Sequence, residues 1–158
     1  MQKIKLAVVD DSQIFRTTII HVLKLQNDFE IVIQAVNGID LMSQLKEIIP
    51  HIILMDIHMP RMDGIEATTK VQQLYPEIKI IALSQYDHEL NIVEMYVQGV
   101  RSFIGKDSGL DELYKAIRVV SDGGAYMTDL SFGIIQKYLS KAQIKLNSPN
   151  LNQEETSL

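Results

Sequence analysis

The chain has 158 residues, of which 46% are apolar, and this length predicts one compact domain at roughly 150 residues per domain. The absence of Cys excludes disulfides, thiol nucleophiles and cysteine-ligated metal sites, and no apolar run approaches the ~20 residues that span a bilayer. Since the N-terminus also has no apolar run long enough for a signal peptide, we expect a cytoplasmic protein without a membrane contact, and the formal net charge of −5 argues against direct contact with nucleic acid.

Five short apolar runs recur along the chain and predict buried β-strands. Stretches with apolar residues at helical spacing separate them. Near-continuous apolar strands are typical of burial on both faces, so this alternation predicts an α/β protein with a parallel sheet. The runs lie at residues 4–9, 29–36, 52–55, 78–83 and 102–104.

Turn and capping residues divide the chain further. Ser12 is expected to cap the first helix, and the segment Ser108 to Asp111 has the pattern of a capping box for the fifth. We predict a compact domain at 1–124, an extra C-terminal helix within 125–142 and a polar linker or tail at 143–158. Lysines on one side of the extra helix are expected to form a solvated face.

Polar residues follow four of the five predicted strands. Asp10 and Asp11 follow the first strand, Asp56 the third, Ser84 the fourth and Lys106 the fifth. Each alone could be an ordinary turn or capping residue. Ligands of parallel α/β sheets bind at the carboxyl ends of the strands, so we expect these groups to converge on one edge. Three crowded carboxylates raise one another's pKa unless cations offset their charge, which a metal ion and Lys106 would do.

The types of ligand in this cluster favour Mg²⁺, because all the donors are oxygens and no histidine pair or Cys is available. An aspartate beside Mg²⁺ and an ammonium group suits attack on phosphorus with formation of an acyl phosphate. Asp56 is the natural nucleophile because it stands alone at the end of a central strand. The adjacent acids Asp10 and Asp11 have the pattern of metal ligands.

Four motifs, in this order, resemble the receiver domain of two-component response regulators. They are VVDDS at 8–12, LMDIHMPRMDG at 54–64, IALS at 81–84 and FIGK at 103–106. The resemblance covers about residues 3–121. It implies a flavodoxin-like, doubly wound sheet of five parallel strands in the order 2-1-3-4-5.

The resemblance also implies a role for each site residue. Asp56 would accept a phosphoryl group from the phosphohistidine of a histidine kinase, and Lys106 would pair with that group. Asp10, Asp11 and Asp56 would bind Mg²⁺ together with the backbone carbonyl of His58. The chain would thus assist its own phosphorylation and dephosphorylation and would not be an enzyme acting on other substrates.

Two further residues are implied to form the switch. Ser84 would hydrogen-bond the phosphoryl group, and its movement would let the ring of Phe103 turn inward. The surface of the fourth helix, fifth strand and fifth helix would change as a result. The driving force would be a new charge of about −1.5 to −2 at one end of the sheet.

The sequence departs from the commonest family pattern at Asp107, where many members have proline. Lys106 with Asp107, and GGAYMT at 123–128, resemble the NarL/FixJ-type transcription regulators, in which a LuxR-type DNA-binding domain follows. We therefore expect the regulatory half of a DNA-binding protein. A free-standing receiver is the alternative.

Two rival functions stay open at this point. A haloacid-dehalogenase-type phosphatase also uses an aspartate nucleophile, but it needs a second acid two residues later, where this chain has His58. A receiver-shaped module that docks without carrying phosphate is disfavoured because all the site positions are chemically competent.

The expected fourth helix, at 88–98, carries more apolar side chains than one buried stripe requires. Some of them should therefore face solvent or a partner. We expect a homodimer, promoted by phosphorylation, through this helix or the helices beside it.

Overall fold

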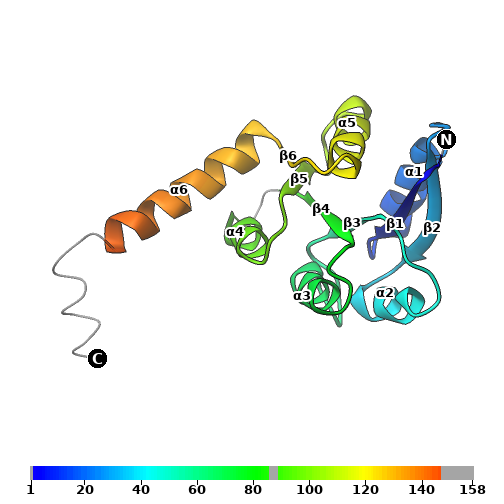
Figure 1. The fold of residues 1–158 in the computed structure, drawn as a ribbon, viewed down its shortest axis with the longest axis horizontal. Coiled ribbons are helices and arrows are strands. Elements are labelled where there is room, and N and C mark those ends of the chain that lie inside the picture. Colours follow the sequence, from blue (N-terminus) through cyan, green and yellow to red (C-terminus); the bar gives the residue numbers. More distant parts are fainter. Residues whose placement is uncertain (1, 86–88, 147–158) are drawn as a thin grey trace.

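The computed structural model describes residues 2–85 and 89–146 (Figure 1). Within these ranges six strands alternate with six helices, and the apolar runs predict the first five of these strands. None of the described helices combines the length and the hydropathy that crossing a bilayer requires. The elements are β1 (Ile4–Val9), α1 (Gln13–Leu23), β2 (Phe29–Ala35), α2 (Gly38–Leu45), β3 (Ile52–Asp56), α3 (Gly64–Leu74), β4 (Lys79–Ser84), α4 (Glu89–Val97), β5 (Ser102–Gly105), α5 (Leu110–Ser121), β6 (Tyr126–Met127) and α6 (Asp129–Leu146).

The strands form one parallel sheet in the order β2-β1-β3-β4-β5-β6. The first five confirm the flavodoxin-like order 2-1-3-4-5. The sixth strand is a correction to the five-stranded prediction: Tyr126 pairs with Ser102, and Met127 pairs with Phe103. Two residues are too few to show a strand period, so the sequence contains no local signal for β6.

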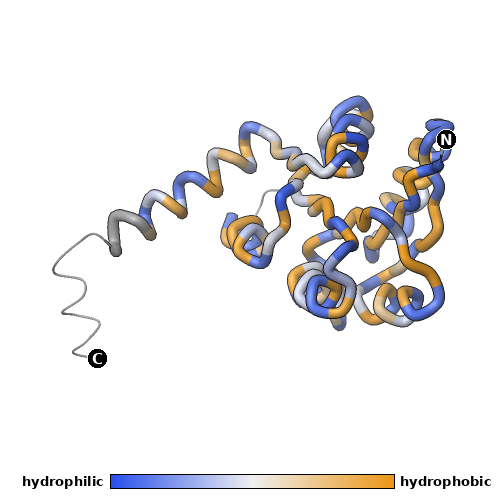
Figure 2. The backbone as a smooth tube through the Cα atoms, in the orientation of Figure 1, coloured by the Kyte–Doolittle hydropathy of each residue, from blue (hydrophilic) through white to orange (hydrophobic). Residues whose placement is uncertain are grey.

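Both faces of the sheet are buried, which explains the near-continuous apolar strands. Leu6 and Val8 pack on the face that α1 and α5 cover, whereas Ala7 and Val9 pack on the face that α2, α3 and α4 cover. Every residue of β3 is buried. Figure 2 shows hydrophobic residues running along the central strands. The doubly wound architecture is thus confirmed.

The two predicted helix caps have different outcomes. Ser12 caps α1, and its Oγ accepts a hydrogen bond from the backbone N–H of Phe15 at 3.3 Å. The capping box at Ser108 is wrong, because α5 begins at Leu110 with Gly109 as its N-cap. The Ser108 N–H instead donates to the carbonyl of Gly105 at 3.0 Å, in a turn that precedes the helix.

Helix α6 extends past residue 142, so the expected start of the polar tail at 143 is too early. Residues 147–158 of that tail lie outside the described residues. Ile134 and Ile135 of α6 are buried in the same apolar cluster as the inner side of α4. The packing of α6 on α4 accounts for part of the apolar surplus of α4, while Leu90 and Val97 remain 64% and 73% exposed.

Candidate functional site

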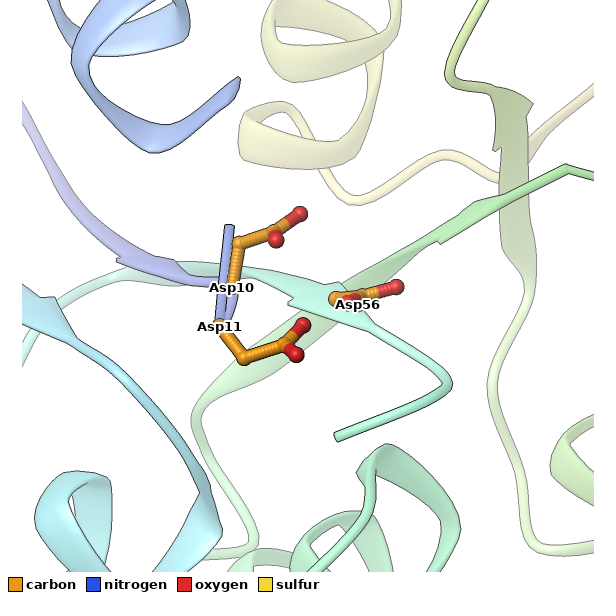
Figure 3. A group of neighbouring side chains, drawn as sticks. All are labelled: Asp10, Asp11 and Asp56. Carbon is orange, nitrogen blue, oxygen red and sulfur yellow. The ribbon is translucent and has the colours of Figure 1, made fainter. Parts of the chain in front are cut away.

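The three acidic residues predicted to converge do lie together. Asp10 and Asp11 follow β1, and Asp56 ends β3, the strand next to β1 in the sheet. One carboxylate oxygen from each residue lies within 4.8 Å of the others. Figure 3 shows the three side chains projecting from these two strand ends into the same space. The parallel pairing of Val9 with Met55 sets this proximity.

Lys106 reaches the same cluster from the end of β5. Its Nζ lies 2.7 Å from Oδ2 of Asp10 and 3.2 Å from Oδ1 of Asp56. The side chain of Lys106 is only 13% exposed. We call Asp10, Asp11, Asp56 and Lys106 the carboxylate edge. Two buried carboxylates tolerate each other here because one buried ammonium pairs with both.

Burial and the charge of Asp10 raise the pKa of Asp56 to about 7, although Lys106 acts in the opposite direction. Burial also disfavours the ammonium of Lys106. The hydrogen bond with Asp10 and the charge of Asp56 outweigh that penalty, and they raise the pKa of Lys106 above its ordinary value. Lys106 is therefore a cation at neutral pH, whereas Asp56 gains its charge close to neutrality. An added divalent cation would favour the carboxylate form of Asp56.

The donor set of the carboxylate edge fits Mg²⁺, because it offers carboxylate oxygens only. Asp10 is already engaged: its Oδ1 accepts from the backbone N–H of Ser12 at 2.8 Å, and its Oδ2 pairs with Lys106. Asp11 is exposed and lines one shallow pocket with His58 on the β3–α3 loop. Asp11 and Asp56 would therefore be the better placed direct ligands.

Ser84 and Phe103 occupy adjacent strands beside the edge. Ser84 ends β4 and is 5% exposed, and its carbonyl accepts a hydrogen bond from the backbone N–H of Lys106 at 2.8 Å. Phe103 is fully buried, with Met127 of β6 as its strand partner. The ring of Phe103 belongs to the apolar cluster that also contains Ile134 and Ile135 of α6.

Sequence reasoning missed several contacts of the site. Arg16 donates from Nη1 to the backbone carbonyl of Asp10 at 2.6 Å, and Asn91 of α4 lies 3.3 Å from Nε2 of His58. The ring of Phe15 lies beside the ammonium of Lys106. An Arg, an Asn or a Phe inside a helix has no motif that marks it, so only the packing of the helices reveals these contacts.

Residues 6–118 match the family described as the response regulator receiver domain. This match spans most of the chain and all the residues of the carboxylate edge. The chain therefore belongs to the response regulator receiver domain family.

Two relatives of this chain are named as regulatory proteins. It is 33% identical over 137 residues to the transcriptional regulatory protein DegU of Brevibacillus brevis, covering 86% of this chain and 58% of DegU. It is 31% identical over 140 residues to the oxygen regulatory protein NreC of Staphylococcus aureus, covering 87% and 64% respectively. The chain thus spans about three-fifths of the length of these relatives.

Among solved structures, the fold is similar to a LuxR-family two-component response regulator from Aurantimonas sp. SI85-9A1. The TM-score is 0.80 at 22% identity, and the match covers 88% of this chain and 99% of the other. At this identity the similarity concerns the fold.

Proposed function

We propose that this chain is the phosphoacceptor domain of a two-component transcription regulator and that a histidine kinase phosphorylates it on Asp56. The observation that carries the proposal is the pairing of a buried carboxylate with a buried ammonium: Asp56 Oδ1 lies 3.2 Å from Lys106 Nζ, beside the carboxylates of Asp10 and Asp11. A group of this kind can attack phosphorus and have the incoming negative charge compensated.

In the proposed transfer, an oxygen of Asp56 attacks the phosphorus of the kinase phosphohistidine. The new O–P bond forms as the N–P bond breaks, and its electron pair returns to the imidazole nitrogen. Lys106 would pair with the transferred phosphoryl oxygens, and Ser84 would donate a hydrogen bond to them. Mg²⁺, when bound by Asp10, Asp11, Asp56 and the His58 carbonyl, would neutralise charge on these oxygens.

The output that we propose is control of transcription through a DNA-binding domain outside this chain. DegU and NreC are regulatory proteins of greater length than the segment they share with this chain, which supports a division of labour between domains. The net charge of −5 supports a receiver that makes no nucleic-acid contact itself. Phosphorylation would also promote a homodimer, which sedimentation before and after phosphorylation would detect.

Incubation with Mg²⁺ and acetyl phosphate, followed by intact mass measurement, tests the proposal. We expect the mass of one added phosphoryl group, and we expect Asp56→Ala to abolish it. An unphosphorylated product would support the docking module instead. Turnover of a small phosphomonoester would favour the phosphatase.

A further inference from the structure

The ammonium of Lys106 has an aromatic neighbour as well as its two carboxylates. Its Nζ lies 4.5 Å from the centre of the Phe15 ring, on α1. Cations within about 6 Å of an aromatic face are attracted by the ring quadrupole, and more strongly where water is excluded. Because the Lys106 side chain is only 13% exposed, this contact is largely shielded from water.

Phe15 is tied down at its backbone and packed against the core. Its backbone N–H donates to the capping Oγ of Ser12, and its half-buried side chain packs against the apolar cluster between α1, α5 and the sheet. Lys106, in contrast, carries its charge on a flexible four-carbon stem. The packed ring therefore offers an aromatic face that the ammonium contacts.

Lys106 also has room to move. A cavity of about 120 Å³ lies between α1 and α5, and both Phe15 and Lys106 line it with Ile19, Leu83 and Ile104. Close packing does not hold the lysine stem on this side. The aromatic face adds to the ion pair with Asp10 in keeping the ammonium in place while the carboxylate of Asp56 becomes an acyl phosphate.

The aromatic face suits this task because it attracts the cation without taking its hydrogen-bond donors. The ammonium has three N–H donors, and its ion pairs with Asp10 and Asp56 account for two. An acidic neighbour in place of Phe15 would compete for the third donor. A phenyl ring leaves that donor available for a phosphoryl oxygen.

We propose that Phe15 is a positioning residue for phosphorylation of Asp56, and that its aromatic face holds the Lys106 ammonium where the phosphoryl oxygens arrive. This inference rests on the proposed function. Loss of the aromatic face should slow phosphorylation by about 2- to 30-fold, the range that corresponds to one cation–π contact.

The decisive experiment uses the full chain with phenylalanine analogues at position 15 that carry one, two, three or five ring fluorines. Fluorination weakens the ring quadrupole stepwise while nearly preserving the shape of the ring. The rate of phosphorylation by acetyl phosphate with Mg²⁺ is measured by intact mass. We expect the logarithm of the rate to fall progressively along the series. A constant rate would overturn the proposal.

Ordinary substitutions supply the controls. Phe15→Leu keeps an apolar side chain without a quadrupole and should be slow, whereas Phe15→Tyr keeps the ring and should retain the rate. Ile14→Ala, at an adjacent residue that is 83% exposed, should not change the rate. In NMR spectra, Phe15→Leu should also remove the ring-current shift of the Lys106 methylene next to Nζ.

An unmodified chain that gains no phosphoryl group would overturn the proposed function as well. An unmodified chain that is phosphorylated, with fluorinated variants of equal rate, would overturn the role of Phe15 alone.

Discussion

Two regions of this molecule use ion pairs in opposite ways. At the carboxylate edge, Lys106 and Asp56 lie 3.2 Å apart with side chains that are 13% and 7% exposed. Where α6 meets α4, Lys137 and Glu89 are also 3.2 Å apart, but their side chains are 51% and 40% exposed. The two ion pairs have equal distances but different strengths of electrostatic attraction, because solvent screens the second pair far more than the first.

The surroundings of each pair show what it contributes. At the carboxylate edge, one ammonium compensates two buried carboxylates, so removing Lys106 would leave both without a cation. At the α6 contact, buried Ile134 and Ile135 provide the apolar packing, and the exposed ion pair of Lys137 with Glu89 lies beside them. Burial, rather than distance, decides which ion pair controls chemistry and which one adjusts packing.

Replacing each lysine by alanine gives the largest contrast between these regions. Lys106→Ala should slow phosphorylation of Asp56 by acetyl phosphate by about 10²- to 10³-fold, because it removes the cation that compensates the incoming charge. Lys137→Ala should leave the rate unchanged, since Lys137 and its partner Glu89 form an exposed pair outside the carboxylate edge. Time courses of intact mass measure both. Equal rates for Lys106→Ala and the unmodified chain would contradict the assignment of Lys106.

Two glycines extend the contrast to backbone packing. A Cβ at Gly64 would lie 2.1 Å from the backbone oxygen of Asp56 and 2.9 Å from Cα of Ile57, so α3 could not approach β3 as it does. Gly64→Ala should therefore lower the free energy of unfolding by about 2 to 3 kcal/mol.

At Gly133 of α6, no described atom lies within 4 Å of the added Cβ. Gly133→Ala should stabilise the chain by about 0.5 to 1 kcal/mol, through helix propensity. Urea unfolding of both variants checks these opposite signs, and destabilisation by both would contradict the packing argument.

The carboxylate edge could be predicted from sequence because its signal is local. Asp10 follows an apolar strand and Asp56 ends another, and parallel pairing then brings the strand ends together. The α6 contact gave no such signal. Strand β6 has two residues, and the partner of Glu89 is far along the chain, at Lys137. The surplus of apolar residues on α4 did indicate an uncovered surface, but it could not show that α6 of the same chain covers part of it.

The pH dependence of stability sharpens the account of the carboxylate edge. Burial and the charge of Asp10 raise the pKa of Asp56 from 3.8 to about 7, so the folded chain binds this proton more tightly than the unfolded chain. The contribution of Asp56 to stability is therefore complete below pH 3.8, and it is lost as the pH rises through about 7.

Asp56→Asn removes this charge and keeps the size of the side chain. Without Mg²⁺ and above pH 7, we expect it to raise the free energy of unfolding by about 1 to 2 kcal/mol, and the gain should vanish in acid below the ordinary pKa. Urea unfolding over this pH range measures the effect. A gain that is the same at all pH values would show that the carboxylate charge is not its cause.

The smallest effect is expected at the α6 contact itself. Lys137 Nζ and the hydroxyl of Tyr138 both donate to Oε2 of Glu89, and these hydrogen bonds lower the pKa of Glu89 from its ordinary 4.5. The contact is thus present above that value and is lost as the pH falls through the lowered pKa.

Glu89→Gln keeps an acceptor for Tyr138 and removes the charge that attracts Lys137. We expect faster hydrogen exchange of the α6 backbone amides with little change in the urea midpoint, because Ile134 and Ile135 still pack on α4. Glu94→Gln, the same change on an exposed site of the same helix, is the matched control and should leave α6 exchange unaltered. If both variants accelerated α6 exchange equally, the net charge of α4, and not the Glu89 contact, would hold the helix in place.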